Sequence, residues 1–336
     1  MAELTVSAGL ARGLVNLAVS KGADRTALLA RAGIAQNALA DQDNRIPFAN
    51  YVSLMRAGKE LAHDPALALH YGETSDFAEV SIVGLIGNAS ETMMEALQQL
   101  NRYGRLVVEF DGGPNRFATE PGGPGGYWLI DARKKPNDFP ELTESTFARM
   151  ICSPRTFGIA QLVKAVEVTH PRPEYSDDVA RVFGAPVTYD APRNAMLIDH
   201  KWSDYRVQLQ PRYAFGVLSQ HADRLLKDLE SSKSVRGKVE ALLMPVLHKG
   251  DASMDAIAEK MAMSRQTLFR RLKDENTTFE KLLDELRHKL ALDYLGAKKV
   301  SVNETAYLVG FSDPAAFSRA FKRWTGKNPR DMRAGE

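Results

Sequence analysis

The spacing of apolar residues predicts helices in the first hundred residues. Leu10 and Leu14 recur at a helical interval, and residues 48–61 and 93–103 repeat that pattern. After residue 104, short apolar runs bounded by glycine, proline and polar residues predict strands instead. The predicted strands cover residues 105–110, 127–132, 164–169, 187–189 and 195–198, and helices are predicted over residues 142–151 and 177–183. This first part is therefore predicted to be an α/β domain.

A glycine- and proline-rich stretch, residues 112–126, separates the first two predicted strands and indicates a loop. A helix is predicted from Pro211 to Leu229. The segment 231–234 (SSKS) is polar and lacks periodicity, so it is predicted to be a linker. Because 336 residues exceed what one hydrophobic core usually supports, two domains are expected. They are placed at residues 1–230 and 235–336.

The C-terminal part contains a pattern typical of a helix-turn-helix at about residues 253–275. Ser253 and Ser264 each stand where a helix N-cap is needed, with a three-residue turn between the two helices. Leu268 and Leu272 lie four residues apart and predict the buried side of the second helix. The opposite face carries polar, aromatic and basic side chains that suit base edges and phosphates. Taken alone, the unit is also consistent with an ordinary helical hairpin whose basic face is solvated.

The pattern recurs at about residues 302–323, which strengthens the interpretation as a DNA-binding unit. Gly310 supplies the turn, where a positive φ is expected, and Asp313 caps the second helix. Phe317 and Phe321 repeat the spacing of the leucine pair in the first unit. The C-terminal part is therefore predicted to be all-helical, with two helix-turn-helix units.

One long amphipathic helix is predicted between the two units, because apolar residues follow one stripe from Phe279 to Leu295. A stiff helix of this length would hold the two recognition helices at a fixed separation. Adjacent major-groove segments on one face of B-DNA lie ~34 Å apart. The pair of units is therefore predicted to bind double-stranded DNA.

The division of charge agrees with a partner that is a polyanion. From Val235 onward there are 19 Lys and Arg residues against 14 Asp and Glu, a balance of +5, and the remainder holds 25 basic and 28 acidic residues, a balance of −3. The single cysteine, Cys152, fits a reducing compartment. No stretch approaches the ~20 apolar residues of a membrane span, and no export signal is found. We therefore expect a cytoplasmic protein without membrane contact.

Three stretches of the C-terminal part carry a resemblance to a known family: MSRQTLFRRLKDE, LRHKLALDYL and AYLVGFSDPAAFSRAFKRWTGKNP. They resemble the AraC/XylS family of bacterial transcription regulators. Two positions depart from the family pattern. Asn276 stands where a glycine is usual, which asparagine tolerates because it adopts left-handed backbone conformations. Thr305 stands where an aliphatic residue is more common.

The resemblance implies particular DNA contacts. Base contacts would come from Gln266, Phe269 and Arg270 in the first unit and from Ala315, Ala316 and Arg319 in the second. Because two alanines offer few direct hydrogen bonds, the first unit is expected to discriminate more between sequences. Phosphate contacts, which position the protein, are expected from Arg265, Arg271, Lys273, Lys322 and Arg323.

The N-terminal part resembles the effector domain of one branch of the same family, called arabinose-binding-like. The stretches GLARGLVNLAVSKGADRTALLARAGI and VTHPRPEYSDDVARVFGAPVTYDAPRNAMLIDH carry this resemblance. It implies small-molecule sensing, dimerisation or both, and it does not establish a sugar ligand. Aromatic residues near an occasional arginine suit a small anion with an apolar tail. The candidate effector-binding residues, each of which also fits a core or surface role, are Tyr103, Arg105, Tyr127, Trp128, Phe147 and Arg149.

These observations predict a sequence-specific transcription regulator, by the family's usual output an activator, that is modulated by a small-molecule effector. A homodimer and contact with RNA polymerase are expected. In an alternative, the N-terminal domain is only a dimerisation or protein-interaction module without a ligand. An alkyl-transfer enzyme would need an activated cysteine, and Cys152 has no second cysteine or adjacent histidine. No enzyme activity, cofactor or metal is expected, since the histidines show no metal-ligand spacing.

Overall fold

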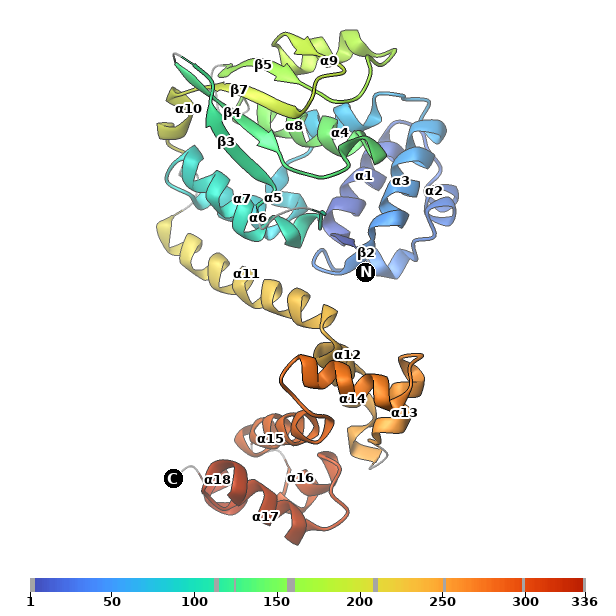
Figure 1. Cartoon of the computed structure of the whole chain (residues 1–336), viewed down its shortest axis with the longest axis vertical. Helices are drawn as coiled ribbons and strands as arrows, with labels where there is room; N and C mark the ends of the chain where they lie inside the picture. Colours follow the sequence, from blue (N-terminus) through green and yellow to red (C-terminus); the bar gives the residue numbers. More distant parts are fainter. Residues whose placement is uncertain are drawn as a thin grey trace. The chain divides into compact units, whose positions relative to one another are not determined.

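The computed structural model describes residues 4–111, 115–123, 125–155, 161–207, 211–249, 252–297 and 300–334. The chain divides into two compact units, Met1–Leu226 and Lys227–Glu336. The first unit contains helices and a five-stranded sheet, and the second consists of helices (Figure 1). This confirms the predicted fold class.

The first unit begins with a helical region closed by a short antiparallel ladder between β1 and β2. Side chains cap several of its helices: Ser7 accepts from Leu10 N, Asp24 from Ala27 N and Thr92 from Glu95 N. The elements are β1 (Thr5–Ser7), α1 (Ala8–Ser20), α2 (Arg25–Ala32), η1 (Gln36–Leu39), β2 (Arg45–Pro47), α3 (Phe48–Leu61), α4 (Leu67–Thr74), α5 (Phe77–Val80), α6 (Ile82–Ala89) and α7 (Met93–Val107).

The sheet of the first unit has the strand order β3-β4-β7-β5-β6, and its neighbours are antiparallel except for the parallel pair β5–β6. Leu129 and Met196 pair across β4 and β7 and pack with Phe147 of α8 in one buried core. The elements are β3 (Phe117–Pro121), β4 (Gly126–Asp131), η2 (Pro136–Asp138), α8 (Glu141–Arg155), β5 (Val163–Glu167), α9 (Ser176–Phe183), β6 (Val187–Thr188), β7 (Asn194–Asp199) and α10 (Lys201–Asp204).

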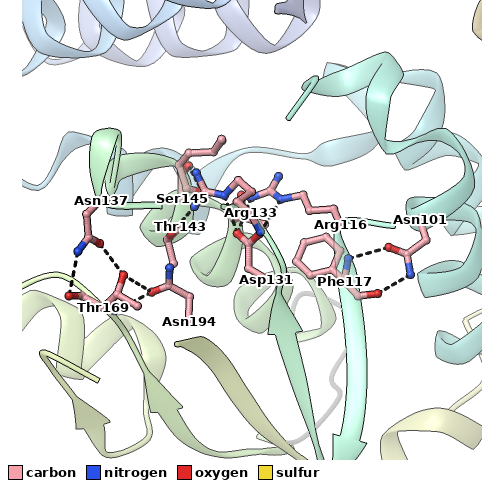
Figure 2. Close-up of polar contacts among 12 residues, drawn as sticks. Asn101, Arg116, Phe117, Asp131, Arg133, Asn137, Thr143, Ser145, Thr169 and Asn194 are labelled. Carbon is pink, nitrogen blue, oxygen red and sulfur yellow. Dashed lines mark hydrogen bonds and ion pairs between the residues drawn. The ribbon is translucent and has the colours of Figure 1, made fainter. Parts of the chain in front are cut away.

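The sequence prediction failed at one strand and missed another. Residues 105–110 were predicted to be a strand, but α7 continues to Val107, because Leu97, Tyr103 and Leu106 extend its buried helical stripe. Strand β3 lies in the stretch expected to be a loop, of which residues 112–114 and 124 lie outside the described residues. Asn101 of α7 holds β3, since its side chain donates to Phe117 O and accepts from Phe117 N, both at 2.9 Å (Figure 2).

The boundary between the two units falls within α11 (Arg212–Lys233). This helix continues through the segment expected to be an aperiodic linker and ends only where Ser234 caps the next helix. The hydroxyls of Ser231 and Ser232 donate to the backbone carbonyls of Asp228 and Leu229. These serine residues can therefore continue the helix, although the polar sequence of this segment did not predict a helix.

The second unit packs around two hydrophobic clusters, and the long helix α15 supplies residues to both. Phe279, Leu282 and Leu286 belong to the first cluster, and Ala291 and Leu295 belong to the second. The elements are α12 (Val235–Leu243), η3 (Met244–Lys249), α13 (Met254–Lys260), α14 (Arg265–Asp274), α15 (Phe279–Ala297), α16 (Val302–Leu308), α17 (Pro314–Thr325) and α18 (Pro329–Ala334).

Candidate DNA interface and effector cavity

The first helix-turn-helix has the boundaries that its capping residues predict. The Ser253 side chain accepts from Ala256 N at the start of α13, and the Ser264 side chain accepts from Thr267 N at the start of α14. Ala262 in the turn has a φ of 51°. Leu268 and Leu272 are buried as predicted, which fixes the opposite side of α14 as its exposed face.

Three side chains with different chemistry lie on that exposed face. Gln266 and Arg270 are exposed, and Phe269 keeps 53% of its surface accessible. A glutamine can read adenine, an arginine can read guanine, and an apolar ring can contact a thymine methyl. The face of α14 is therefore chemically suited to reading base edges.

The basic residues around this face differ in how they are held. Arg265 pairs with Asp255 of α13 at 2.8 Å, and both side chains are largely exposed. This pair links the two helices and orients the Arg265 guanidinium. Arg271 and Lys273 are exposed, and neither forms an ion pair with another residue in the described parts of the chain.

The second helix-turn-helix also follows its predicted signals. Ser301 and Glu304 form a capping box at the start of α16. Gly310 has a φ of 82°, and a Cβ there would stand 2.2 Å from Leu247 O, so the turn requires glycine. Asp313 accepts from Ala315 N and Ala316 N, and these bonds lower the pKa of its carboxyl.

Helix α17 exposes fewer base-reading groups than α14. Phe317 and Phe321 are fully buried, as predicted. Ala315 is exposed, Ala316 is half-buried, and the Arg319 side chain is 75% accessible at 3.9 Å from Asp313. Among the three residues of this helix expected to contact bases, Arg319 is therefore the one whose side chain can form hydrogen bonds with them.

The two other basic residues of α17, Arg323 and Lys322, differ in their contacts with the rest of the unit. Arg323 pairs with Asp284 of α15 at 2.6 Å, and Trp324 Nε1 donates to the same carboxylate at 3.4 Å. Lys322 is exposed. Asp284 thus connects α15 to the end of α17 that carries these groups.

The two departures from the family pattern are accommodated locally. Asn276 has a φ of 56°, so it adopts the left-handed conformation for which glycine is usual. Thr305 is fully buried, and its hydroxyl donates to Ser301 O at 2.9 Å. The polar group of Thr305 is thereby satisfied within its own helix.

The first unit contains a cavity of about 290 Å³. Most of its lining is apolar and comes from helices α6, α7, α8 and α10, with Val83, Leu97, Leu100 and Trp202 among the residues. The charged lining residues include Arg116, Arg149 and the exposed Asp76. Apolar walls with a few charged groups are typical of a small-molecule site.

Arg149 is the least neutralised of the buried charges in this cavity. It is 9% exposed and lies over the rings of Tyr71 and Phe77, at 5.1 and 5.5 Å from their centroids. Its Nε donates to Ser75 Oγ at 3.1 Å. Among the described residues, its Nη2 has no hydrogen-bond partner. A buried guanidinium without a full set of acceptors is unfavourable, so this group suits an anionic ligand.

Arg116 belongs to a buried cluster with Asp131 and Arg133. Figure 2 shows both guanidinium groups converging on Asp131, which lies 3.1 Å from Arg116 Nη2 and 2.9 Å from Arg133 Nε. Burial alone would raise the pKa of Asp131, but the two arginine charges and their hydrogen bonds outweigh it and lower that pKa. Burial lowers the pKa of Arg133 to about 10. Two cations share one carboxylate, so the cluster keeps an excess of positive charge.

Of the six residues proposed from sequence for the effector site, only Arg149 lines the cavity. Phe147 is a core residue, and the Tyr127 ring packs against the Trp202 ring. Trp128 lies on the opposite face of β4, where Arg193 covers its ring at 4.8 Å. The residues that line the cavity come from segments that are far apart in the sequence. Closeness along the chain therefore could not identify them.

The last two of the six, Tyr103 and Arg105, make other contacts. The Tyr103 hydroxyl donates to Asp223 of α11 at 2.8 Å, and burial together with that carboxylate raises the pKa of Tyr103 to about 12. Arg105 lies over the Phe110 ring at 5.5 Å. Both residues therefore support the packing of α7.

A buried carboxyl that was not predicted from sequence lies on α8. Glu144 is 2% exposed, and the Tyr175 hydroxyl lies 3.0 Å from each of its oxygens. His170 Nε2 is 3.7 Å from Glu144 Oε1. Burial raises the pKa of Glu144 to about 7; Glu141 adds to this effect, whereas Tyr175 and Lys59 oppose it.

Cys152 is buried, and burial raises the pKa of its thiol, which disfavours the reactive thiolate. Within the described ranges, no group of three or more His, Cys, Asp or Glu residues could hold a metal ion. Across the same parts of the chain, no helix has the length and apolar character needed to span a membrane.

A family model described as the arabinose-binding domain of AraC transcription regulator, N-terminal, matches residues 22–207, more than half of the chain. This chain belongs to the AraC family of transcription regulators. A second model, described as a helix-turn-helix domain, matches residues 257–335 of this AraC-family regulator and includes α14 and α17. The resemblance inferred from sequence is confirmed in both parts.

Two relatives align with this AraC-family regulator over nearly its whole length. The ornithine utilization regulator of Pseudomonas aeruginosa is 26% identical over 99% of this chain and 97% of its own. The transcriptional regulator VirS of Mycobacterium tuberculosis is 24% identical over 96% of this chain and 94% of its own. The transcriptional activator RhaS of Escherichia coli is 38% identical over 25% of this chain and 31% of its own. Relatives of this chain are thus transcription regulators, and its helix-turn-helix domain is a DNA-binding domain.

Proposed function

We propose that this AraC-family regulator binds promoter DNA through α14 and α17, and that a small molecule bound in its N-terminal domain modulates this binding. In this proposal the chain acts as a homodimer, with an effector and dimerisation domain at residues 1–230 and a DNA-binding domain at residues 235–336. It activates transcription by contact with RNA polymerase.

The exposed face of α14 carries the DNA-binding part of the proposal. Phe269 is a large apolar residue left accessible between Gln266 and Arg270 on a helix whose other side is buried. Together the three groups offer an adenine reader, a thymine-methyl contact and a guanine reader.

The two recognition helices have unequal roles in this proposal. Helix α14 supplies three base-reading side chains, whereas α17 supplies Arg319 beside Ala315 and Ala316. Helix α17 acts mainly by fitting closely into the groove and by Arg319. Phosphate contacts come from exposed basic residues on the same two helices, namely Arg265, Arg271, Lys273, Lys322 and Arg323.

The effector part of the proposal is supported by the 290 Å³ cavity of the first unit and by Arg149 within it. The name of the P. aeruginosa relative, a regulator of ornithine utilisation, also associates a protein of this organisation with a small metabolite. For modulation, the effector must bind two states of this protein with different affinities. Activation is supported by the name of RhaS, which is an activator.

A binding selection from randomised DNA tests the base-contact assignment. Arg270→Ala is expected to weaken operator binding by ~1–3 kcal/mol and to relax preference at one position. Lys281→Ala, at an exposed position of α15 outside both recognition helices, is the matched control and should select the same operator as the wild-type protein. An operator preference that Arg270→Ala leaves unchanged would refute the assignment.

The effector part needs a separate measurement. Operator affinity of the full-length protein is measured against a metabolite panel, with thermal shift as the binding readout. A compound that both raises the melting temperature and changes operator affinity is the expected result. If no compound changes either quantity, the N-terminal domain acts without a ligand, as a dimerisation or protein-interaction module.

A further inference from the structure

The size of the cavity limits the size of its ligand. An engineered cavity of about 150 Å³ in another protein accepts benzene, which has six non-hydrogen atoms. The cavity of about 290 Å³ is about twice as large. A ligand of about twelve non-hydrogen atoms would fill it by the same measure.

The charge of Arg149 limits the chemistry of that ligand. The guanidinium is buried, and its described contacts are two aromatic rings and one serine hydroxyl, all of them uncharged. Ring contacts compensate only part of the desolvation of a cation. A carboxylate or similar anion would supply the acceptor that Nη2 lacks.

The surrounding charges favour an anion as well. Arg116, which also lines the cavity, shares Asp131 with Arg133, so this cluster carries two positive charges and one negative. The acidic lining residue Asp76 is exposed, and one of its oxygens accepts from Ala78 N at the start of α5. A ligand that is wholly cationic would therefore meet like charge in the buried part of the cavity.

From these observations we propose that the cavity binds a monoanionic, largely apolar small molecule of about twelve non-hydrogen atoms, whose anionic group pairs with Arg149. Its apolar body lies against Val83, Leu97, Leu100 and Trp202. This inference rests on the proposed function, in which a small molecule binds the N-terminal domain, and it specifies the class of that molecule.

The test compares two probes that differ in charge and hardly in shape: 4-phenylbutyrate and 4-phenylbutyramide. Each has about twelve non-hydrogen atoms, the number expected from the cavity. Isothermal titration of the full-length protein near pH 7.5 is expected to show the carboxylate binding about tenfold to a hundredfold more tightly than the amide, since hydrogen bonds to charged groups contribute that much. Equal affinities, or no binding of either probe at millimolar concentration, would overturn the inference.

Two variants locate the site. Arg149→Met removes the charge and should weaken carboxylate binding to the level of the amide, whereas Arg149→Lys should keep part of the preference. Arg193→Met is the matched control, because Arg193 also covers an aromatic ring but lies outside the cavity lining. A carboxylate preference that survives in Arg149→Met contradicts the assignment.

A substitution at Gly87 tests the cavity without touching a charge. Gly87 lines the cavity within α6, and a Cβ there would meet no atom within 4 Å. Gly87→Leu therefore fills open space, favours the helix and should abolish binding of the carboxylate probe. Gly216→Leu on α11, where a Cβ is equally unobstructed, should leave binding unchanged. Undiminished binding in Gly87→Leu places the probe elsewhere and overturns the inference.

The outcomes separate this inference from the proposed function. If an uncharged or cationic metabolite changes operator affinity and loses this effect in Gly87→Leu, the ligand class is wrong but the ligand-modulated function stands. If 4-phenylbutyrate binds through Arg149 while no ligand changes operator affinity, the inference about the cavity stands but ligand-modulated DNA binding is wrong.

Discussion

The buried carboxyl of Glu144 predicts an unusual dependence of stability on pH. Its pKa is about 7 in the folded chain and 4.5 as an ordinary glutamate, so folding takes up a proton between these two values. Stability of the first unit should therefore fall as the pH rises from about 4.5 to about 7. The shift of roughly two and a half pH units corresponds to about 3 kcal/mol.

Substitution of Glu144 by glutamine isolates this effect. Glutamine cannot ionise, and its amide oxygen can still accept from the Tyr175 hydroxyl. Glu144→Gln should therefore be more stable than the wild-type protein at pH 8, by up to about 3 kcal/mol, and by less than about 1 kcal/mol at pH 5. Glu60→Gln is the control, because the Glu60 side chain is 71% exposed and its replacement should leave the pH profile unchanged.

The measurement is urea denaturation between pH 5 and pH 8.5, followed by tryptophan fluorescence. The chain has three tryptophans, and a Trp324→Phe background leaves Trp128 and Trp202, both in the first unit. The reasoning is refuted if Glu144→Gln is less stable than the wild-type protein at pH 8. It is equally refuted if the stability difference does not change with pH.

Three further predictions concern the second unit, each measured by denaturation of the full chain and followed through Trp324. Leu272→Ala should destabilise it by about 2–5 kcal/mol, because the fully packed side chain of α14 leaves a cavity. Gly310→Ala should destabilise the second unit by more than about 1 kcal/mol, because φ is positive at this position and the new Cβ would clash with Leu247 O. As its counterpart, Gly296→Ala within α15 should stabilise the unit by about 0.5–1 kcal/mol, because alanine favours a helix more than glycine does. Thr305→Val should change stability by less than about 1 kcal/mol, because Ser301 O keeps its bond from Thr305 N.

The helix-turn-helix units could be predicted from sequence because their determinants are local. Ser264 caps the recognition helix that begins at the next residue, and Gly310 has the positive φ expected of a turn glycine. The buried pairs Leu268–Leu272 and Phe317–Phe321 follow directly from helical spacing. Each of these features has a signal in the residue itself and in its near neighbours along the chain.

The structure of the N-terminal unit was predicted less completely, because the residues that determine it are far apart in the sequence. Strand β3 has few residues typical of strands and is held by pairing with β4 and by Asn101 of α7. The cavity combines residues from α1 to α10, so closeness in sequence to the strands was a poor guide to its lining. Arg149 was named as a candidate from its residue type and lines the cavity, whereas Glu144 had no signal in the sequence because its raised pKa results from burial.

Helix α15 divides its buried residues between two clusters that have no residue in common. Leu286 is the last α15 residue of the first cluster, and the second begins near Leu290 and Ala291. Between them, Arg287 donates to Gly310 O. The cooperativity of unfolding in this unit therefore depends on the α15 backbone around residue 288, together with the close approach of Gly310 to Leu247 O. Were that helix interrupted, each half would keep a core of its own, and the slowest-exchanging amides would separate into two groups with different protection.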